Sequence, residues 1–512
     1  MMTFTSLLIQ TGLVLITAIA YRIIYNIHFH PLSKFPGPWY CATSSLPLAI
    51  ISLLKREPKF LLGLARKYAD GDNPIRISPT LLLFPKPSSI KYIYQDPRHN
   101  TKTGLYGTGM LGPPNIFTVM DGNEHKALRK ALGGPQWSFG ALKNVWEERV
   151  DNLVKLFVSK MTDFAKRNEE VVLCDKVAQF AADVMTLVCF GETWGFVRNS
   201  RDERNILQSF RDGLVMFGFG GRWRTFRETV LKTPLGVSLF LPKASDDRGI
   251  GFLVGQAGQL VARRERENRM AENGGKEHHD FLQHALEARF KDGNKPLSDL
   301  QKLAHVTILV TAGADTTGTA MGSTLNYLLV NKKCLDKVRE EIGDADSKGL
   351  LSNPIQYEET RMHLPYTVAC VKEGGLRLRP PATNLFGRVA GAGGAKICHG
   401  DVYVPEGTEM TSNAYVVQRD PEVFGPDPEV FRPERWLESD EQKLSEMEAA
   451  MFVFGVGPRV CLGKDIAVFE LYKLLPEIVR RFEMDLVREG RYVVSGGVAY
   501  NKDLVVKLRL RD

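Results

Sequence analysis

Cysteine is scarce in this chain, which has seven cysteines among 512 residues. Their number is odd, they are widely scattered, and no Cys-x-x-Cys pair occurs, so neither a disulfide framework nor a zinc site is expected. The sequence also lacks any Asn-x-Ser/Thr glycosylation site. These absences are typical of a domain that never enters the secretory lumen.

Charge is absent from the N-terminus before Arg22, and the run SLLIQTGLVLITAIAYRII is strongly apolar. At ~1.5 Å rise per residue, a helix of roughly twenty such residues covers about 30 Å, the thickness of a bilayer core. We therefore expect residues 1–27 to form a membrane anchor. A cleaved signal peptide is the alternative, but it requires basic residues ahead of the apolar run, and this chain has none there.

Positive charge appears only after the apolar run, at Arg22, His28, His30 and Lys34. The positive-inside rule then places the N-terminus in the lumen and the rest of the chain in the cytosol. Residues 28–45 contain PLSKFPGP, whose prolines predict a stiff linker. No second linker, repeat or low-complexity segment follows, so we expect residues 46–512 to form one continuous domain.

The formal net charge is +8, with the charged residues interspersed along the chain. This distribution argues against a nucleic-acid-binding tail and fits an acidic partner or an anionic membrane surface. Hydrophobic periodicity predicts a mainly α domain with small β-sheets, in the α+β class. The expected helices cover residues 147–165, 177–189, 253–271, 298–331 and 467–482, and the expected strands lie within 74–84, 396–404 and 504–510.

Aromatic residues, glycines and arginines mix in residues 216–241, which contain MFGFGGRWRTF. Two interpretations stay open for this region. It is either a flexible loop between helices, or a mobile lid that touches the membrane or admits an apolar substrate.

The stretch FGVGPRVCLG, residues 454–463, surrounds Cys461 with three glycines, a proline and Arg459. A reduced interior cysteine is usually only a small hydrophobic residue. Here the glycines permit close backbone approach, and the following residues begin a helix whose N-terminus favours a thiolate. A cysteine thiolate can bind the iron of a porphyrin, and the guanidinium of the nearby Arg459 suits the carboxylate of a porphyrin propionate.

The longer stretch FGVGPRVCLGKDIAVFE resembles the cysteine-loop signature of the cytochrome P450 family, which are haem-thiolate monooxygenases. The resemblance covers nearly everything after the anchor and implies the cytochrome P450 fold, preceded here by one transmembrane helix. It also implies haem b as the cofactor, with Cys461 as the axial iron ligand that favours O–O cleavage.

The motif AGADTT, residues 312–317, lies inside the expected helix 298–331, which opens with a capping-box pair at Ser298 and Gln301. Taken alone, a threonine within a helix more often bonds back to the carbonyl four residues earlier. The family resemblance instead implies catalytic roles for Asp315 and Thr316, as an acid and an alcohol that relay protons to bound oxygen.

Glu373 and Arg377 in KEGGLRLRPP stand four residues apart, on one face of a helix. An ordinary surface ion pair at this spacing contributes little to stability. The resemblance implies instead a buried structural network in which Arg435 of FRPERW joins the pair. Gln418 stands where relatives usually carry histidine, and we attach no mechanism to that change.

Four further residues resemble the family's haem-binding positions: His125 and Arg129 in HKALR, Arg388 in LFGRVA, and Arg459 in the cysteine loop. His125 stands where the family often has tryptophan. For Arg388 there is a second interpretation, that it is a solvent-exposed arginine at a strand edge without a role in haem binding. The resemblance therefore implies that these side chains bind the haem propionates.

The implied activity is NADPH-dependent monooxygenation of an apolar small molecule. The chain carries no flavin or nucleotide fingerprint, so electrons must come from a separate NADPH–cytochrome reductase. The basic residues Lys126, Lys130, Arg459 and Lys464 are candidates for its docking face. Candidate substrate contacts lie in residues 105–118, 216–241, 381–386 and 496–500.

The segment FHPLSKFPGP resembles fungal members that tailor secondary metabolites, in the endoplasmic reticulum membrane with the catalytic domain on the cytosolic face. Two alternatives stay open. One is a haem-thiolate isomerase or dehydratase that needs no external electrons, against which the intact Asp315–Thr316 pair argues. The other is a non-catalytic haem- or lipid-binding membrane protein.

Overall fold

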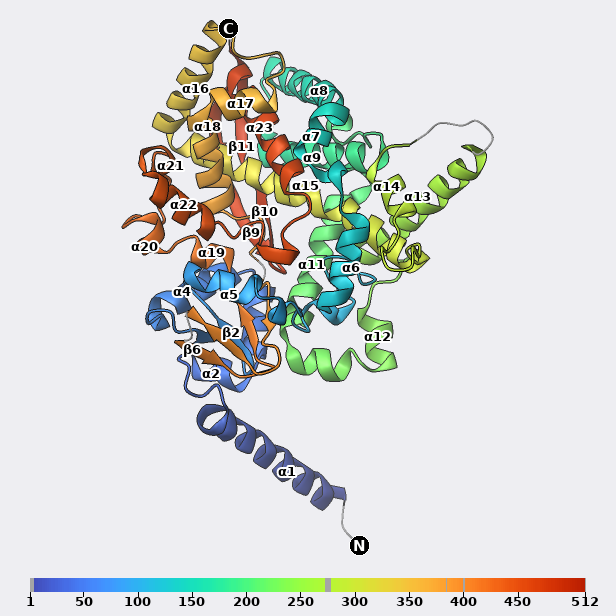
Figure 1. Cartoon of the computed structure of the whole chain (residues 1–512), viewed down its shortest axis with the longest axis vertical. Helices are drawn as coiled ribbons and strands as arrows, with labels where there is room; N and C mark the ends of the chain where they lie inside the picture. Colours follow the sequence, from blue (N-terminus) through green and yellow to red (C-terminus); the bar gives the residue numbers. More distant parts are fainter. Residues whose placement is uncertain (1–3, 272–277, 384, 399–400, 512) are drawn as a thin grey trace.

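The computed structural model describes residues 4–271, 278–383, 385–398 and 401–511. Helices fill most of the molecule, and small sheets lie at one end and within the helical body (Figure 1). The predicted mainly α fold with small sheets is therefore confirmed. The helix α1 (Phe4–Ile24) projects from the end of the domain that holds β2 and β6, so its first turns lie far from the helical body (Figure 1).

The long helices form around the predicted periodic segments. The largest is α15, which begins after Ser298 with the predicted capping box: the Ser298 hydroxyl accepts from the Gln301 amide, and the Gln301 side chain accepts from the Ser298 amide. This helix runs through the centre of the molecule, and α9 packs along it (Figure 1). The principal helices after α1 are α2 (Trp39–Thr43), α3 (Leu46–Leu53), α4 (Glu57–Tyr68), α6 (Gly122–Leu132), α8 (Glu147–Lys166), α9 (Leu173–Phe190), α11 (Ile206–Arg222), α12 (Pro234–Phe240), α13 (Gly249–Ala271), α15 (Asp299–Val330), α16 (Lys332–Ser347) and α23 (Lys464–Arg481).

Four small sheets complete the described fold. The sheet nearest α1 has the strand order β1–β2–β7–β4, in which β2 and β7 run parallel. Its strands are β1 (Ile75–Arg76), β2 (Leu81–Leu83), β7 (Glu409–Thr411) and β4 (Arg388–Val389). The other strands are β3 (Glu170–Val172), β8 (Phe482–Arg488) and β11 (Val505–Leu510) in one sheet, and the hairpins β5 (Ala395–Ile397) with β6 (Val402–Val404) and β9 (Arg491–Ser495) with β10 (Val498–Lys502).

Helix α1 (Phe4–Ile24) continues into a short π-helix, Tyr25–Phe29. The stretch Ile9–Phe29 is long and apolar enough to cross a membrane, and almost none of it is buried in the protein. The chain that follows is packed onto the domain, because Leu32 and Phe35 are buried. Arg76 of β1 donates from Nη1 to the Asn26 carbonyl at 2.6 Å, which ties the end of the anchor to the sheet.

Residues 216–241 are mostly helical, since they hold the end of α11, a π-helix (Phe226–Val230) and α12. The interpretation of this region as a flexible loop is therefore wrong. Close packing explains Gly218: a Cβ there would lie 2.8 Å from both the Ser52 Oγ of α3 and the Gly496 Cα between β9 and β10. The glycine therefore lets α11 pack closely against α3 and against the β9–β10 turn.

Candidate functional site

The loop around Cys461 is shaped by two glycines with left-handed backbone. Gly455 and Gly457 have φ of 67° and 69°, a region that side chains rarely adopt. A Cβ on Gly457 would also meet the Tyr94 carbonyl at 2.4 Å. The Cys461 amide donates to the Phe454 carbonyl at 2.8 Å, which closes the loop before α23 begins at Lys464. The thiol is thus held three residues before a helix N-terminus, as the sequence predicted.

Cys461 opens into an internal cavity of about 320 Å³. Its exposed surface faces that cavity, so burial still acts on the thiol. Burial raises the pKa of Cys461, whereas the Gly463 amide, Arg129 and Lys464 lower it. The groups expected to favour the thiolate are therefore present. In the free protein their effect on the pKa is smaller than that of burial. A bound metal ion would stabilise the thiolate form.

The cavity runs between α15 and the Cys461 loop. All four regions proposed to contact substrate contribute to its wall, through Ile116, Phe217, Pro381 and Val498 among others. Apolar side chains dominate the lining. A cavity that is mostly apolar, with a few polar groups at fixed places, is typical of sites for small molecules and cofactors.

Basic side chains gather at one part of this wall. His125, Arg129, Arg388 and Arg459 all line the cavity, as predicted from the sequence. A fifth residue, Lys102, lines it too and was missed by the sequence analysis. The local sequence KTGLY supplies one neighbour, Tyr106, whose ring centre lies 4.0 Å from the Lys102 Nζ. It does not mark the lysine as buried, because Phe117, whose ring centre lies 4.5 Å away, comes from a distant part of the loop.

These basic side chains have no acidic partner within hydrogen-bonding or ion-pair distance among the described residues. Arg388 donates to the Phe386 and Gly387 carbonyls, and Arg129 donates to the Val460 carbonyl at 2.5 Å. Burial and then Arg459 lower the pKa of His125 to about 3, and its Nδ1 is enclosed without a partner. Burial and the neighbouring Arg388 also lower the pKa of Lys102.

Arg459 is largely occupied by the protein itself. Its guanidinium donates to the carbonyls of Asn100, Val119, Met120 and Asp121, at distances of 2.9 to 3.2 Å. Burial, and then Arg388, lower its pKa to about 9. The residue therefore holds the cysteine loop against the chain that precedes α6. A contact with a propionate stays a prediction.

The donor set fits an iron porphyrin. Uncompensated buried cations are costly, so the cluster of Lys102, Arg129 and Arg388, with the neutral imidazole of His125 as a further donor, suits a dianionic ligand such as a pair of propionates. No group of three or more His, Cys, Asp or Glu side chains is placed to hold a bare metal ion among the described residues. Cys461 can supply only one ligand, so a macrocycle must supply the others.

Thr316 reaches the cavity from α15, and its hydroxyl bonds back into the helix. The Oγ1 donates to the Ala312 carbonyl at 2.8 Å, with the Gly313 carbonyl at 3.3 Å. This is the local hydrogen bond expected for any threonine within a helix. A Cβ on Gly313 would overlap Met185, so the helix lies tightly against α9 at this point.

Asp315 does not line the cavity. It is buried between α15 and α11, where Arg211 donates to its carboxylate at 2.7, 3.1 and 3.2 Å. Burial raises the pKa of Asp315, and the Arg211 guanidinium opposes this rise. The structure thus brings Thr316 to the cavity, and it places Asp315 one residue away within a buried ion pair.

Glu373 lies at the centre of a buried network. Arg377 donates to it twice at 2.7 Å, and Arg435 donates from Nε at 2.9 Å. The Trp436 indole donates to the other carboxylate oxygen at 2.9 Å. Glu373, Arg377 and Arg435 thus meet as the sequence analysis predicted, although the segment Val371–Leu378 is a π-helix.

Gln418 connects this network to the cysteine loop. Its Nε2 donates to the Leu376 and Arg377 carbonyls at 2.8 and 2.9 Å, and its Oε1 accepts from the Phe452 amide at 2.9 Å. The sequence analysis gave this residue no role. Its fixed amide joins the π-helix to the chain that enters the Cys461 loop.

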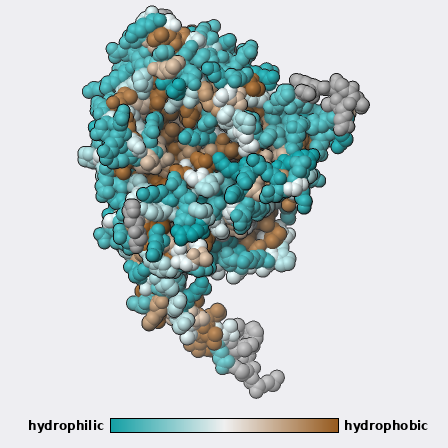
Figure 2. Space-filling view, viewed as in Figure 1, coloured by the Kyte–Doolittle hydropathy of each residue, from teal (hydrophilic) through white to brown (hydrophobic). Residues whose placement is uncertain are grey.

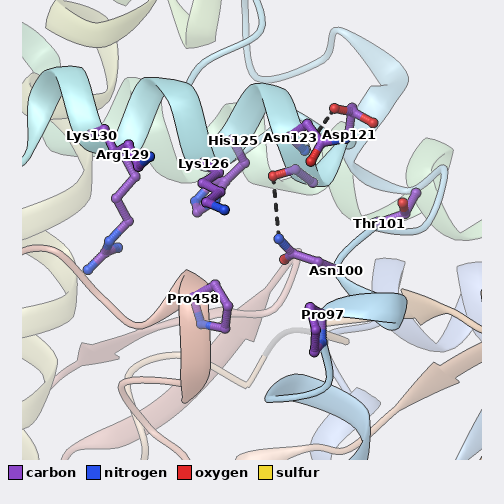
Figure 3. Close-up of a pocket in the computed structure, with 11 residues that line it drawn as sticks. Pro97, Asn100, Thr101, Asp121, Asn123, His125, Lys126, Arg129, Lys130 and Pro458 are labelled. Atoms are coloured by element: carbon purple, nitrogen blue, oxygen red, sulfur yellow. Dashed lines mark hydrogen bonds between the residues drawn. The ribbon is translucent and has the colours of Figure 1, made fainter. Parts of the chain in front are cut away.

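A second hollow, of about 380 Å³, opens on the outer side of α6. Figure 3 shows Lys126, Arg129 and Lys130 on this helix with Pro458 of the cysteine loop opposite. Lys126 and Lys130 are exposed, and neither makes an ion pair with a described residue. This basic face lies directly outside the wall that His125 and Arg129 form on the internal cavity.

Comparison with known proteins agrees with this geometry. The family model described as Cytochrome P450 matches residues 92–493. A "Cytochrome P450 monooxygenase" of Aspergillus terreus is 30% identical over 470 residues, which cover 88% of this chain and 90% of that protein. "Cytochrome P450 monooxygenase gsfF" of Penicillium aethiopicum is 29% identical, with 95% of each chain covered. "Cytochrome P450 monooxygenase ABA1" of Pyricularia oryzae is 28% identical over 98% of this chain and 97% of its own length.

Proposed function

The chain belongs to the cytochrome P450 family, and we propose that it is an NADPH-dependent monooxygenase that hydroxylates an apolar small molecule. In the proposed reaction RH, O2, NADPH and H⁺ give ROH, water and NADP⁺. The observation that carries this proposal is the cavity itself, which is lined together by Cys461, by a cluster of basic side chains and, from α15 on its other side, by Thr316.

The proposed cofactor is haem b, which when bound supplies the activation of O2. The Cys461 sulfur would be its axial ligand. Arg129, Arg388, Lys102 and His125 would hold its propionates, because these buried donors have no carboxylate of their own within reach among the described residues. Arg459 supports the same site by holding the cysteine loop in place.

Proton delivery is assigned to Asp315 and Thr316. The Thr316 hydroxyl can turn from the Ala312 carbonyl toward the cavity and donate a proton there. The Asp315 carboxylate would resupply that position, and its pairing with Arg211 sets how readily it takes up a proton. The two residues are consecutive on α15, although only the Thr316 side chain faces the cavity.

Electrons would enter from a separate NADPH–cytochrome reductase at the basic face outside α6. Lys126 and Lys130 are exposed there, and Lys464 begins α23 beside the cysteine loop. Opposite charges on the two partners would speed and orient the encounter. Arg459 drops out of this docking set, because its guanidinium is engaged with backbone carbonyls inside the protein.

The bilayer would receive α1 and one face of the domain. Leu235 and Leu239 of α12 are 69% and 66% exposed, and Trp39 at the start of α2 is 67% exposed. Figure 2 shows an apolar patch where Figure 1 places α12, on the half of the domain nearest α1. We place the protein in the endoplasmic reticulum membrane, with a single span and the catalytic domain in the cytosol.

The substrate class is inferred from the cavity and from the relatives. An apolar wall suits an apolar molecule. The curated relatives are fungal monooxygenases, which supports oxidative tailoring of a fungal secondary metabolite as the pathway class. The identity of that metabolite would come from neighbouring genes or from compounds that accumulate when the gene is deleted.

The test reconstitutes the full-length protein with haem, a fungal NADPH–cytochrome reductase and lipid. Candidate metabolites from the deletion strain are supplied, and product and NADPH consumption are measured together. Product that requires NADPH and incorporates oxygen from ¹⁸O2 supports the proposal. Turnover of substrate without NADPH would favour an isomerase or dehydratase, and haem binding without any turnover would favour a non-catalytic role.

A further inference from the structure

One face of α15 lines the cavity over three helical turns. Its members recur at the spacing of a single helix face, three or four residues apart. The residues at this spacing are His305, Ile308, Leu309, Ala312, Gly313 and Thr316, and Thr307, Thr311, Thr317 and Ala320 of the same helix line the cavity as well. Thr316 lies in the part of this face that the proposed chemistry uses, and His305 is its first residue.

His305 is a polar residue in an apolar setting. It is only 3% exposed, and its ring makes no hydrogen bond with any residue that the structure describes. Burial, and then the nearby His284, lower its pKa to about 4, so the imidazole is neutral near pH 7. A neutral imidazole offers one N–H donor and one nitrogen acceptor. Leaving both unused inside a protein is costly, so a partner is expected.

The neighbouring polar groups have partners of their own. The Thr307 hydroxyl donates to the Leu303 carbonyl at 2.8 Å, and the Thr311 hydroxyl donates to the Thr307 carbonyl at 3.1 Å. His284 is within 3.1 Å of the Leu132 carbonyl through its Nε2. These three side chains therefore have little need of a ligand.

Glu470 of α23 also lines the cavity, and its carboxyl group has no hydrogen-bond partner among the described residues. Both carboxyl oxygens are enclosed by the protein, so they are not open to a molecule in the cavity. His305 lines the cavity, and Trp137 and Met185 line it as well. The imidazole is thus a hydrogen-bonding group on a wall of large apolar side chains.

The spacing along the helix sets the size of a ligand that uses both ends. Eleven residues separate His305 from Thr316, which at ~1.5 Å per residue is roughly 16 Å. We propose that His305 is a substrate-recognition residue that hydrogen-bonds an uncharged hydroxyl, carbonyl or amide group. The substrate is then an elongated, mostly apolar molecule whose oxidised carbon lies beside Thr316, at the end away from that polar group.

This inference rests on the proposed function, because it takes the cavity to be the substrate site. Its test measures binding alone. Linear 1-alkanols of increasing length and the matched alkanes are titrated into the haem-loaded full-length protein, by calorimetry and by the change in haem absorption. The same titrations use His305→Phe, His305→Gln and the control Thr307→Val, which removes a neighbouring hydroxyl that already has a partner.

The wild-type protein should bind the best-fitting alkanol roughly 3- to 10-fold more tightly than its alkane, since one hydrogen bond contributes modestly in net terms. His305→Phe should remove that preference and keep alkane binding. His305→Gln should retain part of the preference because it keeps a donor and an acceptor, and Thr307→Val should retain all of it.

Three outcomes would overturn the assignment. They are an unchanged alkanol preference in His305→Phe, tighter binding of the matched alkanoate than of the alkanol, or no binding of any chain length by the wild-type protein. A thiolate-type haem spectrum and NADPH-linked turnover that persist alongside such a result would leave the proposed function standing. If those two signals were absent, the proposed function would fail while calorimetry still tested His305.

Discussion

Arg211 of α11 and Asp315 of α15 form a buried ion pair joined by hydrogen bonds of 2.7, 3.1 and 3.2 Å. The pair joins the helix nearest the apolar α12 region to the helix that carries the proposed proton relay. It also turns the acid away from the cavity that Thr316 faces. The acid and the alcohol of the AGADTT motif are therefore adjacent in sequence but differ in their surroundings.

Replacing Thr316 by alanine should uncouple electron flow from product formation. The change removes the hydroxyl near the cavity and leaves Cys461 and the buried cations in place. NADPH oxidation should continue while hydrogen peroxide rises and the ratio of product to NADPH falls. Thr316→Ser, which keeps a hydroxyl, is the matched control. An unchanged ratio in Thr316→Ala would assign the relay to ordered water or to the substrate.

Asp315→Asn should slow turnover by roughly 10²-fold, the effect of a positioned acid–base group. The same change leaves Arg211 buried without its charge partner, so a loss of stability should accompany it. Arg211→Ala separates the two effects, because it keeps the acid but removes the cation that opposes the rise in the pKa of Asp315. Product formation and thermal unfolding are measured for both variants. Turnover of Asp315→Asn within twofold of wild type would reduce Asp315 to a structural role.

Cys461→Ala should abolish the red-shifted absorption that the reduced carbon monoxide complex of a haem-thiolate protein displays. No other described cysteine could replace Cys461 as the iron ligand, because none of them lines the cavity. Cys370, for example, is buried away from it. Cys370→Ala is the control and should keep the band. If folded, haem-loaded wild-type protein lacked this band, thiolate ligation by Cys461 would be wrong.

Glu373→Gln should destabilise the domain by about 3–5 kcal/mol, the usual effect of removing one partner from a buried ion pair. Arg377 and Arg435 would then lose their counter-charge while fully buried. Glu169→Gln provides the matched control, because its pair with Arg167 is about half exposed and should contribute at most about 1 kcal/mol. Denaturant unfolding of both variants gives the comparison, and equal small losses would contradict a structural network.

Deleting residues 1–25 should release most of the protein from membranes while haem binding persists. The cut keeps Asn26, whose carbonyl accepts from Arg76, so the docked segment stays intact. Residual binding should depend on α12, and adding Leu235→Ser with Leu239→Ser should lower it further. Vesicle flotation measures both steps. Full retention of the truncated chain on membranes would require a second integral segment.

The sequence determined the features that depend on local chemistry. The capping box at Ser298, the glycines around Cys461 and the spacing of Glu373 to Arg377 each act within a few residues, and the structure contains them. Helix periodicity likewise located α8, α9, α13, α15 and α23. The resemblance supplied the family, which the matching model and relatives then confirmed.

Only the tertiary structure decided which distant groups meet. Arg211 pairs with Asp315 across 104 residues, and Arg459 binds carbonyls more than 330 residues away. Lys102 joins the basic side chains of the cavity through its contact with Phe117, and His305 has no hydrogen-bond partner among the described residues, because of what folds around them. Burial and long-range packing fix the charge state and the partners of a side chain. Neither depends on its immediate sequence neighbours, so no local pattern reveals them.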